Sequence, residues 1–306
     1  MSDRTIIEAA ISGSSKARNP NAPASLADLS ADAIACIAAG AGIVHNHLED
    51  FSLSGRAAAE RYGLVWQPVL QRHPDAILIP TLAPGTPGDA LGNYAHIVDA
   101  MAKGASLAPI DPGSVNMTGA LPDGQPDPAR SMAFVNDYAT LDRALDAYAA
   151  HAVPASISVW DPTFLRATLA YERAGRFAAG SFLKLFFGGR HSYLDGRPGV
   201  SFGLPATVAA LDVYLAMMQG SRLPWAVALL GDDLVAERDF VAAVIARGGH
   251  LRVGLEDYAG PATPANADLV AQAAEIAASL GRPAASIAET RQILGLPARR
   301  AADSQE

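Results

Sequence analysis

Apolar runs of strand length alternate along the chain with longer segments in which apolar residues recur every three or four positions. The short runs have the length of buried strands, and the longer ones have the period of amphipathic helices. Strands are therefore predicted at residues 5–12, 42–47, 76–80, 106–111, 155–160, 181–187, 225–230 and 250–255. Helices are predicted at residues 25–39, 55–73, 89–103, 138–150, 163–174, 207–218, 234–247 and 266–280, with one more at 286–294.

The order of these elements predicts a fold class. The strands are apolar on both faces and each precedes a helix, which is typical of a parallel sheet covered by helices. Eight such units in 306 residues match a (β/α)8 TIM barrel, so we expect residues 1–306 to form a single α/β barrel domain with a short C-terminal helical extension. The alternative is a doubly wound open sheet, but residues 12–16 lack the G-x-G-x-x-G that such a sheet places after its first strand. The glycine- and proline-rich segment from Gly113 to Pro128 is predicted to be a long loop.

Composition and charge exclude some classes of partner. The formal net charge is −8 and no basic run is present, so we expect no nucleic acid partner. The single cysteine, Cys36, lies in an apolar helical pattern and suits a core position in a reducing compartment. No apolar stretch approaches 18 residues and no signal-peptide pattern follows Met1, so no membrane partner is expected. We therefore expect a soluble, cytoplasmic protein.

The second predicted strand ends in two histidines. His45 and His47 are two positions apart, so both side chains point to the same face of the strand. In a closed barrel the eighth strand lies next to the first and the first next to the second, so Glu256 can reach the same point. Two imidazoles and one carboxylate with an open position are typical of a catalytic divalent metal site. The alternative is a pair of solvated or hydrogen-bonded histidines at a strand end.

The eighth predicted strand carries a second pattern. Arg252, Gly254 and Glu256 alternate onto one face, and Asp257 follows directly. Gly254 is expected to leave space beside a ligand or a neighbouring side chain. A carboxylate at Asp257 beside Arg252 would be a general base held in place by a guanidinium. The alternative is a structural ion pair of Arg252 with Glu256 or Asp257 at the barrel mouth.

Other polar residues lie on the strands or follow them, toward the carboxyl ends where barrel enzymes place their active sites. The candidate substrate-binding residues among them are Glu8, Ser14, Glu49, Asn116, Ser158 and Asp232.

Several stretches of the chain resemble the family of β-keto acid cleavage enzymes. They are residues 6–13 (IIEAAISG), Asn19-Pro20, residues 39–41, the Asp111/Asn116 loop, Asp161, and residues 248–257 (GGHLRVGLED), together with the His-x-His strand. The resemblance covers the full length and implies a TIM barrel, usually a homotetramer, with a catalytic zinc ion. It implies His45, His47 and Glu256 as the zinc ligands. It also implies Asp257 as the catalytic base, Arg252 as its partner and Thr81 as the source of a hydroxyl that assists the reaction.

The resemblance further implies a reaction. A β-keto acid condenses with acetyl-CoA, and a retro-Claisen cleavage then releases acetoacetate and a new acyl-CoA. Lys184 and Arg190 are candidates for binding the keto-acid carboxylate or the CoA phosphates, and a solvated Arg190 is the alternative.

The chain also departs from the family pattern. A member of the family has Arg where this chain has Glu49, Glu where it has Ser158, and Arg-His where it has Asp232-Asp233. The proposed metal ligands, base and arginine are intact, so these changes concern the substrate. The additional carboxylates indicate a cationic or hydroxylated substituent on the keto acid, unless Asp232 and Asp233 simply cap the seventh helix.

Two rival functions are compatible with a metal-binding barrel. A metal-dependent hydrolase of the amidohydrolase type also uses His-x-His, but it places the pair after its first strand and adds histidines on strands five and six. A catalytically silent metal-binding barrel is the second rival, and the intact Arg252 and Asp257 argue against it.

Overall fold

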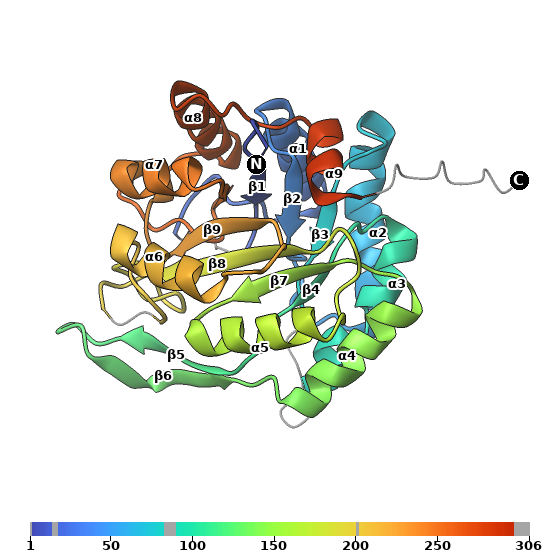
Figure 1. Ribbon diagram of the computed structural model, residues 1–306, viewed down its shortest axis with the longest axis horizontal. Helices are drawn as coiled ribbons and strands as arrows, with labels where there is room; N and C mark the ends of the chain where they lie inside the picture. The colour runs from blue at the N-terminus through green and yellow to red at the C-terminus, as the bar shows by residue number, and fades with distance from the viewer. Residues whose placement is uncertain (1, 14–17, 83–89, 200–201, 297–306) are drawn as a thin grey trace, which may run out of the picture.

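A computed structural model describes residues 2–13, 18–82, 90–199 and 202–296 of the protein. Eight parallel strands form the central sheet (Figure 1): β1 (Ile7–Ala10), β2 (Ile43–Asn46), β3 (Leu78–Pro80), β4 (Ala108–Ile110), β7 (Ala155–Val159), β8 (Phe182–Gly188), β9 (Trp225–Leu230) and β10 (His250–Val253). Their spatial order is β3-β2-β1-β10-β9-β8-β7-β4. The N–H of Ser106, just before β4, donates to the carbonyl oxygen of Leu78 in β3 at 2.8 Å. The two outer strands therefore meet, and the nearly closed barrel confirms the predicted TIM-barrel fold.

Helices surround the sheet on its outside (Figure 1). They are α1 (Leu26–Ala38), α2 (Gly55–Arg72), α3 (Ile97–Lys103), α4 (Tyr138–Ala150), α5 (Pro162–Arg173), α6 (Val208–Met217), α7 (Arg238–Ala246), α8 (Asn266–Ser279) and α9 (Ile287–Leu294). Polar caps explain where several of them begin. Ser25, rather than Ser30, caps α1 by accepting from the N–H of Asp28, and Asp161 caps α5 in the same way at Thr163. In the described part of the chain, no helix is both long and apolar enough to cross a membrane.

Three predicted segments differ from the structure. The segment expected to be a loop contains an antiparallel hairpin of β5 (Val115–Ala120) and β6 (Pro126–Phe134), so that prediction was wrong. Most of β6 is exposed, and its sequence lacks the alternation of apolar residues that indicates a strand. The helix predicted at 89–103 is a 3-10 turn η1 (Ala90–Tyr94) followed by α3, with residue 89 outside the described ranges. The helix predicted at 234–247 is interrupted at Glu237, between the 3-10 turn η2 (Leu234–Ala236) and α7.

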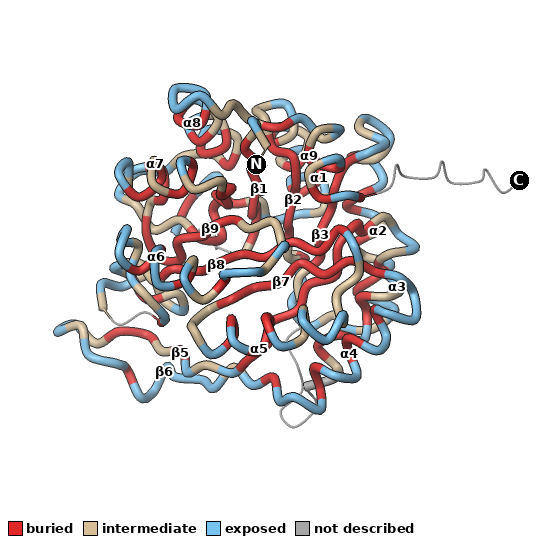
Figure 2. Tube along the Cα trace, viewed as in Figure 1, coloured by how far each residue is buried: buried red, intermediate tan, exposed pale blue. Residues whose placement is uncertain are grey.

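Buried residues lie along the strands and the inner faces of the helices, whereas the outer faces of the helices are exposed (Figure 2). One apolar cluster fills the space between sheet and helices. A smaller one packs around Ile6, Ile43 and Phe182, residues on strands or next to them. Beyond it, toward the carboxyl ends of the strands, several buried residues are charged, and these define the candidate site.

Candidate active site

His45 and His47, at the end of β2, lie close to Glu256, which follows β10, and β1 is the strand between β2 and β10. His45 Nε2 lies 3.3 Å from Glu256 Oε2, and His47 Nε2 lies 3.1 Å from Glu256 Oε1. One ligand atom from each residue falls within 4.8 Å of the others. The adjacency predicted from the barrel order therefore brings these three side chains together.

Hydrogen bonds to the backbone fix the segments that carry these side chains. Ser12 Oγ accepts from the N–H of His47 at 2.8 Å and donates to its carbonyl oxygen at 3.0 Å. The N–H of Glu256 donates to the carbonyl oxygen of Ala10 at 3.2 Å. Gly254 has a φ of +148°, and a Cβ there would overlap that same carbonyl. The space expected beside Gly254 is thus filled by the β1 backbone rather than by a ligand, because the end of β10 passes very close to β1.

The electrostatics of the three side chains suit a divalent cation. Burial lowers the pKa of His45 to about 4, so its imidazole is neutral and has a free lone pair at neutral pH. Burial alone would raise the pKa of Glu256, but Arg252 and the two histidines hold it well below its usual range. Two imidazole nitrogens and one carboxylate are the donor set of several catalytic zinc sites, in which a fourth position stays open for water or substrate. The residues therefore fit the zinc ion that the sequence resemblance implies.

Arg252 lies at the centre of the buried charges. It is 2% exposed and donates from Nε and Nη2 to the two carboxylate oxygens of Asp257, at 2.9 and 3.0 Å. Its Nη1 donates to Glu8 Oε1 at 2.8 Å, and Nη2 lies 2.9 Å from Glu256 Oε2. Lys184 Nζ also reaches Glu8 Oε1, at 3.3 Å. Two buried cations thus face three buried carboxylates, and the surplus negative charge favours a bound cation.

Asp257 has the properties of a proton acceptor. Burial raises its pKa to about 6, although the adjacent Arg252 opposes that rise. At neutral pH the group is therefore a carboxylate that takes up a proton more readily than an exposed aspartate does. Both of its oxygens are held by one guanidinium, which gives it a defined orientation.

Other predicted residues lie around this cluster. Thr81 follows β3, and two hydrogen bonds fix its backbone. Its N–H donates to the Tyr62 hydroxyl at 3.0 Å, and its carbonyl oxygen lies 2.8 Å from His96 Nε2. Ser158 is buried in β7, and Asp111 follows the neighbouring strand β4. Burial raises the pKa of Asp111 to about 6, and Ser158 offsets part of the rise by hydrogen bonding.

Some candidates have other partners. Glu49 pairs with Arg61 of α2, and Asp232 binds Arg190 through two hydrogen bonds of 2.6 and 2.7 Å. Asn116 is exposed in the β5–β6 hairpin. Because the Asp232 carboxylate is occupied by Arg190, it does not cap the seventh helix. Asp233 does cap η2, by accepting from the N–H of Val235. Ser14 lies outside the described residues.

Aromatic residues that were not among the candidates from the sequence line the same end of the barrel. The guanidinium carbon of Arg252 lies 5.2 Å from the ring centre of Phe186. Phe186 stacks on Trp160 at 5.4 Å, and Tyr193 meets Trp160 edge-on at 6.3 Å. Phe186 is two positions after Lys184 on β8 and so shares its face, a signal that was present in the sequence. Tyr193 lies in the loop after β8, where no periodic pattern indicates its position.

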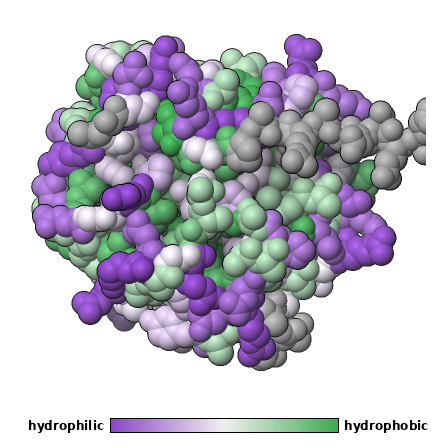
Figure 3. All heavy atoms as spheres, turned by 45° about the vertical axis from the view of Figure 1, so that its right-hand side comes forward, coloured by the Kyte–Doolittle hydropathy of each residue, from purple (hydrophilic) through white to green (hydrophobic). Residues whose placement is uncertain are grey.

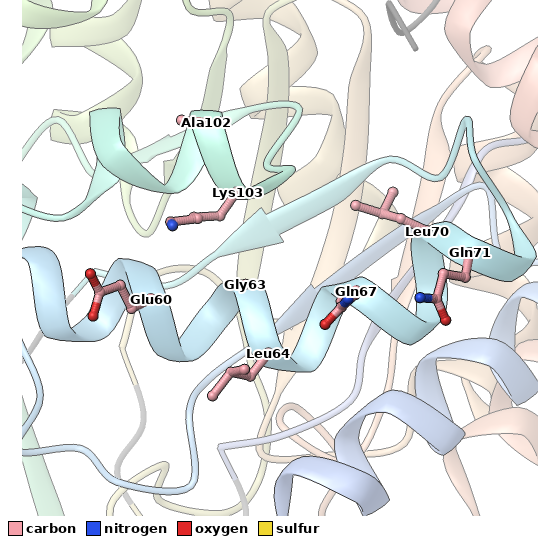
Figure 4. A pocket seen from close by; sticks show the side chains of 8 residues that line it. All are labelled: Glu60, Gly63, Leu64, Gln67, Leu70, Gln71, Ala102 and Lys103. Carbon is pink, nitrogen blue, oxygen red and sulfur yellow. The ribbon is translucent and has the colours of Figure 1, made fainter. Parts of the chain in front are cut away.

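A surface groove lies elsewhere, away from these residues. It runs along α2 and α3 on the outside of the barrel, has a volume of about 770 Å³, and is lined by Glu60, Gly63, Leu64, Gln67, Leu70, Gln71, Ala102 and Lys103 (Figure 4). The stem of Lys103 packs over Gly63. The groove shares no lining residue with the charged cluster. The face of the molecule shown in Figure 3 mixes polar and apolar residues.

Fold and site together define a class: a TIM-barrel enzyme with a candidate divalent metal centre at the carboxyl ends of its strands, beside a buried arginine–aspartate pair. The model of one protein family, the beta-keto acid cleavage enzymes, matches residues 4–296, and the chain belongs to that family. The predicted family is thereby confirmed, and with it an enzyme that cleaves β-keto acids. The match favours this activity over the amidohydrolase-type rival.

Characterised relatives are similar over nearly their whole length. The chain is 26% identical over 302 residues to a 3-keto-5-aminohexanoate cleavage enzyme of Acetoanaerobium sticklandii, covering 96% of this chain and 99% of the relative. It is 25% identical over 303 residues to a 3-oxoadipate:acetyl-CoA acetyltransferase of Cupriavidus necator, covering 97% and 96%. A solved ternary complex of ObcA with a C4-CoA adduct and oxalate has a TM-score of 0.69 at 18% identity, covering 92% of this chain and 68% of that one. The last likeness shows the barrel fold.

Proposed function

We propose that the protein is a zinc-dependent acyltransferase that condenses a β-keto acid with acetyl-CoA and releases acetoacetate and a new acyl-CoA. The family supports cleavage of a β-keto acid, and the name of the Cupriavidus necator relative supports acetyl-CoA as the second substrate. The observation that carries the proposal is the position of Asp257. A carboxylate held by Arg252 directly follows Glu256, the carboxylate of the candidate metal group.

The chain's own residues account for the first proton transfer. A divalent ion held by His45, His47 and Glu256 would supply a Lewis acid for the oxygens of the keto acid. Asp257 accepts a proton from the carbon between the ketone and the carboxylate, the most acidic carbon of the substrate. Arg252 keeps that carboxylate oriented through two hydrogen bonds, and both side chains are buried.

The remaining steps balance without any further reactant. The carbanion attacks the carbonyl carbon of acetyl-CoA, and the CoA thiolate leaves. The thiolate then attacks the original ketone, the bond between that ketone and the central carbon breaks, and the proton returns from Asp257 to the central carbon. All atoms of the two substrates are recovered in acetoacetate and the acyl-CoA. Thr81 is proposed to assist with its hydroxyl, the role that the resemblance implies, and hydrogen bonds hold its backbone at the end of β3.

The substituent of the keto acid is proposed to contact residues on the barrel interior. Glu8 and Ser158 are fully or largely buried on barrel strands and suit this role. Ser14, Glu49, Asn116 and Asp232 remain proposed substrate contacts from the sequence, although Glu49 and Asp232 each already bind an arginine. A homotetramer, which the resemblance implies, and a cytoplasmic location, which the composition predicts, remain part of the proposal.

Isotope labelling tests the reaction directly. The zinc-loaded protein is incubated with a panel of β-keto acids and acetyl-CoA labelled with carbon-13 at the acetyl carbonyl. The proposal expects the label at the ketone carbon of acetoacetate and an unlabelled new acyl-CoA for at least one keto acid. Consumption of a keto acid at the same rate without acetyl-CoA would show a hydrolase or a decarboxylase instead.

A further inference from the structure

Asn266, the first residue of α8, reaches the ends of two barrel strands although it lies on a helix. It is fully buried. Its Oδ1 accepts from the N–H of Leu255 at 2.7 Å, and its Nδ2 donates to the carbonyl oxygen of Ile11 at 2.8 Å. Leu255 immediately precedes Glu256, and Ile11 immediately precedes Ser12. One side-chain amide therefore joins the segment that carries a metal ligand to the segment that supports another.

The support on the histidine side is a short chain of hydrogen bonds. The N–H of Ile11 donates to the carbonyl oxygen of His45 at 3.0 Å. The next residue, Ser12, bonds both the N–H and the carbonyl oxygen of His47 through its hydroxyl. A shift of the β1 end would therefore move both histidines relative to Glu256.

The remaining hydrogen of the Asn266 amide is also used. Nδ2 donates to Asp32 Oδ2 on α1 at 2.6 Å, in addition to its bond to Ile11. Both donor hydrogens and the oxygen of the amide thus have partners, and a buried amide in that state has a single favoured orientation. Only an amide side chain offers one acceptor and two donors in one plane, so neither a carboxylate nor a hydroxyl can replace all three bonds.

We propose that Asn266 is a positioning residue that sets the affinity of the His45/His47/Glu256 group for its divalent ion. This inference rests on the metal centre proposed above. Asn266 holds Leu255 and Ile11 at a fixed separation, so the ligands approach a common point before the ion binds. Groups that orient metal ligands typically contribute about 10- to 100-fold to affinity. The substitution Asn266→Ala is expected to raise the dissociation constant for zinc by about that factor.

Asn19 provides a matched control on the same side of the barrel. It is also a buried asparagine, and its Nδ2 donates to the carbonyl oxygen of Pro264 at 3.0 Å. It thus joins the loop after β1 to the segment before α8, and its bonds to the described residues do not reach a residue next to a candidate ligand. Asn19→Ala is expected to lower the melting temperature and to change the zinc dissociation constant by less than about twofold, because Asn266 still holds the strand ends.

The measurement is the zinc dissociation constant from competition with a chromogenic chelator, with the melting temperature of the metal-free protein recorded beside it. If Asn266 were purely structural, Asn266→Ala would behave like Asn19→Ala, with a lower melting temperature and an unchanged zinc dissociation constant, and that result would overturn the proposal. A wild-type protein that binds no zinc would show instead that the metal centre is wrong, and the role of Asn266 would fall with it.

A second variant covers the case in which Asn266→Ala does not fold. The double substitution Asp32→Asn, Asn266→Asp keeps an oxygen for the N–H of Leu255 and an amide–carboxylate pair with α1, but it replaces the donor to Ile11 with a carboxylate oxygen that faces the Ile11 carbonyl oxygen. It is expected to raise the zinc dissociation constant by about tenfold. An unchanged constant in this variant contradicts the proposal as well.

Discussion

Arg252 binds Asp257 through two hydrogen bonds, from Nε to Oδ2 at 2.9 Å and from Nη2 to Oδ1 at 3.0 Å. The same Nη2 lies 2.9 Å from Glu256 Oε2. One guanidinium therefore fixes the proposed base and a proposed metal ligand relative to each other. Because consecutive residues leave the chain in different directions, Glu256 can face the histidines while Asp257 faces Arg252.

The first prediction concerns metal content. The purified protein is expected to carry about one divalent ion per chain, because two imidazoles and a carboxylate with surplus negative charge converge at one point. His45→Ala and Glu256→Ala should each lose the ion, whereas His151→Ala, at an exposed position after α4, should keep it. Elemental analysis of the three proteins after dialysis is the measurement. Full metal content in both ligand variants would remove the assignment.

The second prediction concerns the buried charges on the inner side of the barrel. Glu8 is fully buried and accepts from both Lys184 and Arg252. Burial raises its pKa, but the two cations more than offset that, so Glu8 is ionised in the folded protein. Glu8→Gln leaves a buried ammonium without its counter-charge and should cost about 3–5 kcal/mol of stability.

A double-mutant cycle distinguishes this pairing from simple loss of packing. Lys184→Met removes the ammonium, so its addition to Glu8→Gln should recover part of the lost stability. The quantity measured is the free energy of unfolding of the four proteins in urea. Strictly additive losses would show that Glu8 and Lys184 are not coupled.

Local sequence patterns predicted the barrel and the metal group for a physical reason. Strand-length apolar runs are required wherever a strand is covered on both sides, so every barrel strand was visible in the sequence. His45 and His47 share a face by strand periodicity, and the closed strand order places Glu256 beside them. These relationships follow from periodicity and topology alone.

Long-range polar pairing could not be predicted in the same way. Glu49 and Asp232 follow barrel strands as an active-site residue would, but each binds an arginine that no periodic pattern connects to it. The bonds of Asn266 could not be predicted either, since it is the first residue of a helix and yet it is hydrogen-bonded to the ends of two strands. The β5–β6 hairpin was missed because β6 is largely exposed and therefore carries no apolar alternation.

The third prediction concerns stability at acidic pH. Burial, reinforced by Arg282, lowers the pKa of His250 to about 3, and its Nδ1 accepts from the N–H of Ile6 at 2.9 Å. Between about pH 6.5 and pH 3 the unfolded chain binds a proton at His250 that the folded protein does not. The contribution of neutral His250 is therefore complete above about pH 6.5 and is lost as the pH falls, by roughly 1.4 kcal/mol per pH unit.

His250→Asn tests that linkage, because an asparagine oxygen can replace Nδ1 as the acceptor but does not titrate. The variant should be less stable at pH 7.5, since the rest of the ring is lost, and its melting temperature should fall less steeply between pH 6.5 and 5 than that of the wild type. Parallel pH profiles for the two proteins would contradict the shifted pKa.

The fourth prediction separates catalysis from metal binding. Asp257→Asn keeps the shape of the side chain but cannot accept a proton at neutral pH. It should retain the ion, because His45, His47 and Glu256 are unchanged, and lose about 10²- to 10⁴-fold in kcat, the usual contribution of a positioned general base. Arg252→Ala should also lower the rate, since Asp257 would lose the partner that orients it and opposes the rise of its pKa.

The control is Asp233→Asn, which changes an aspartate that caps η2 and makes no contact with Arg252 among the described contacts. Its kcat should stay within about twofold of the wild type at matched zinc occupancy, since the proton acceptor is intact. If Asp257 served only as an ion-pair partner, its asparagine variant would melt at a lower temperature and keep nearly full kcat per folded molecule. A loss of less than about tenfold in kcat would therefore contradict the role of Asp257 as the base.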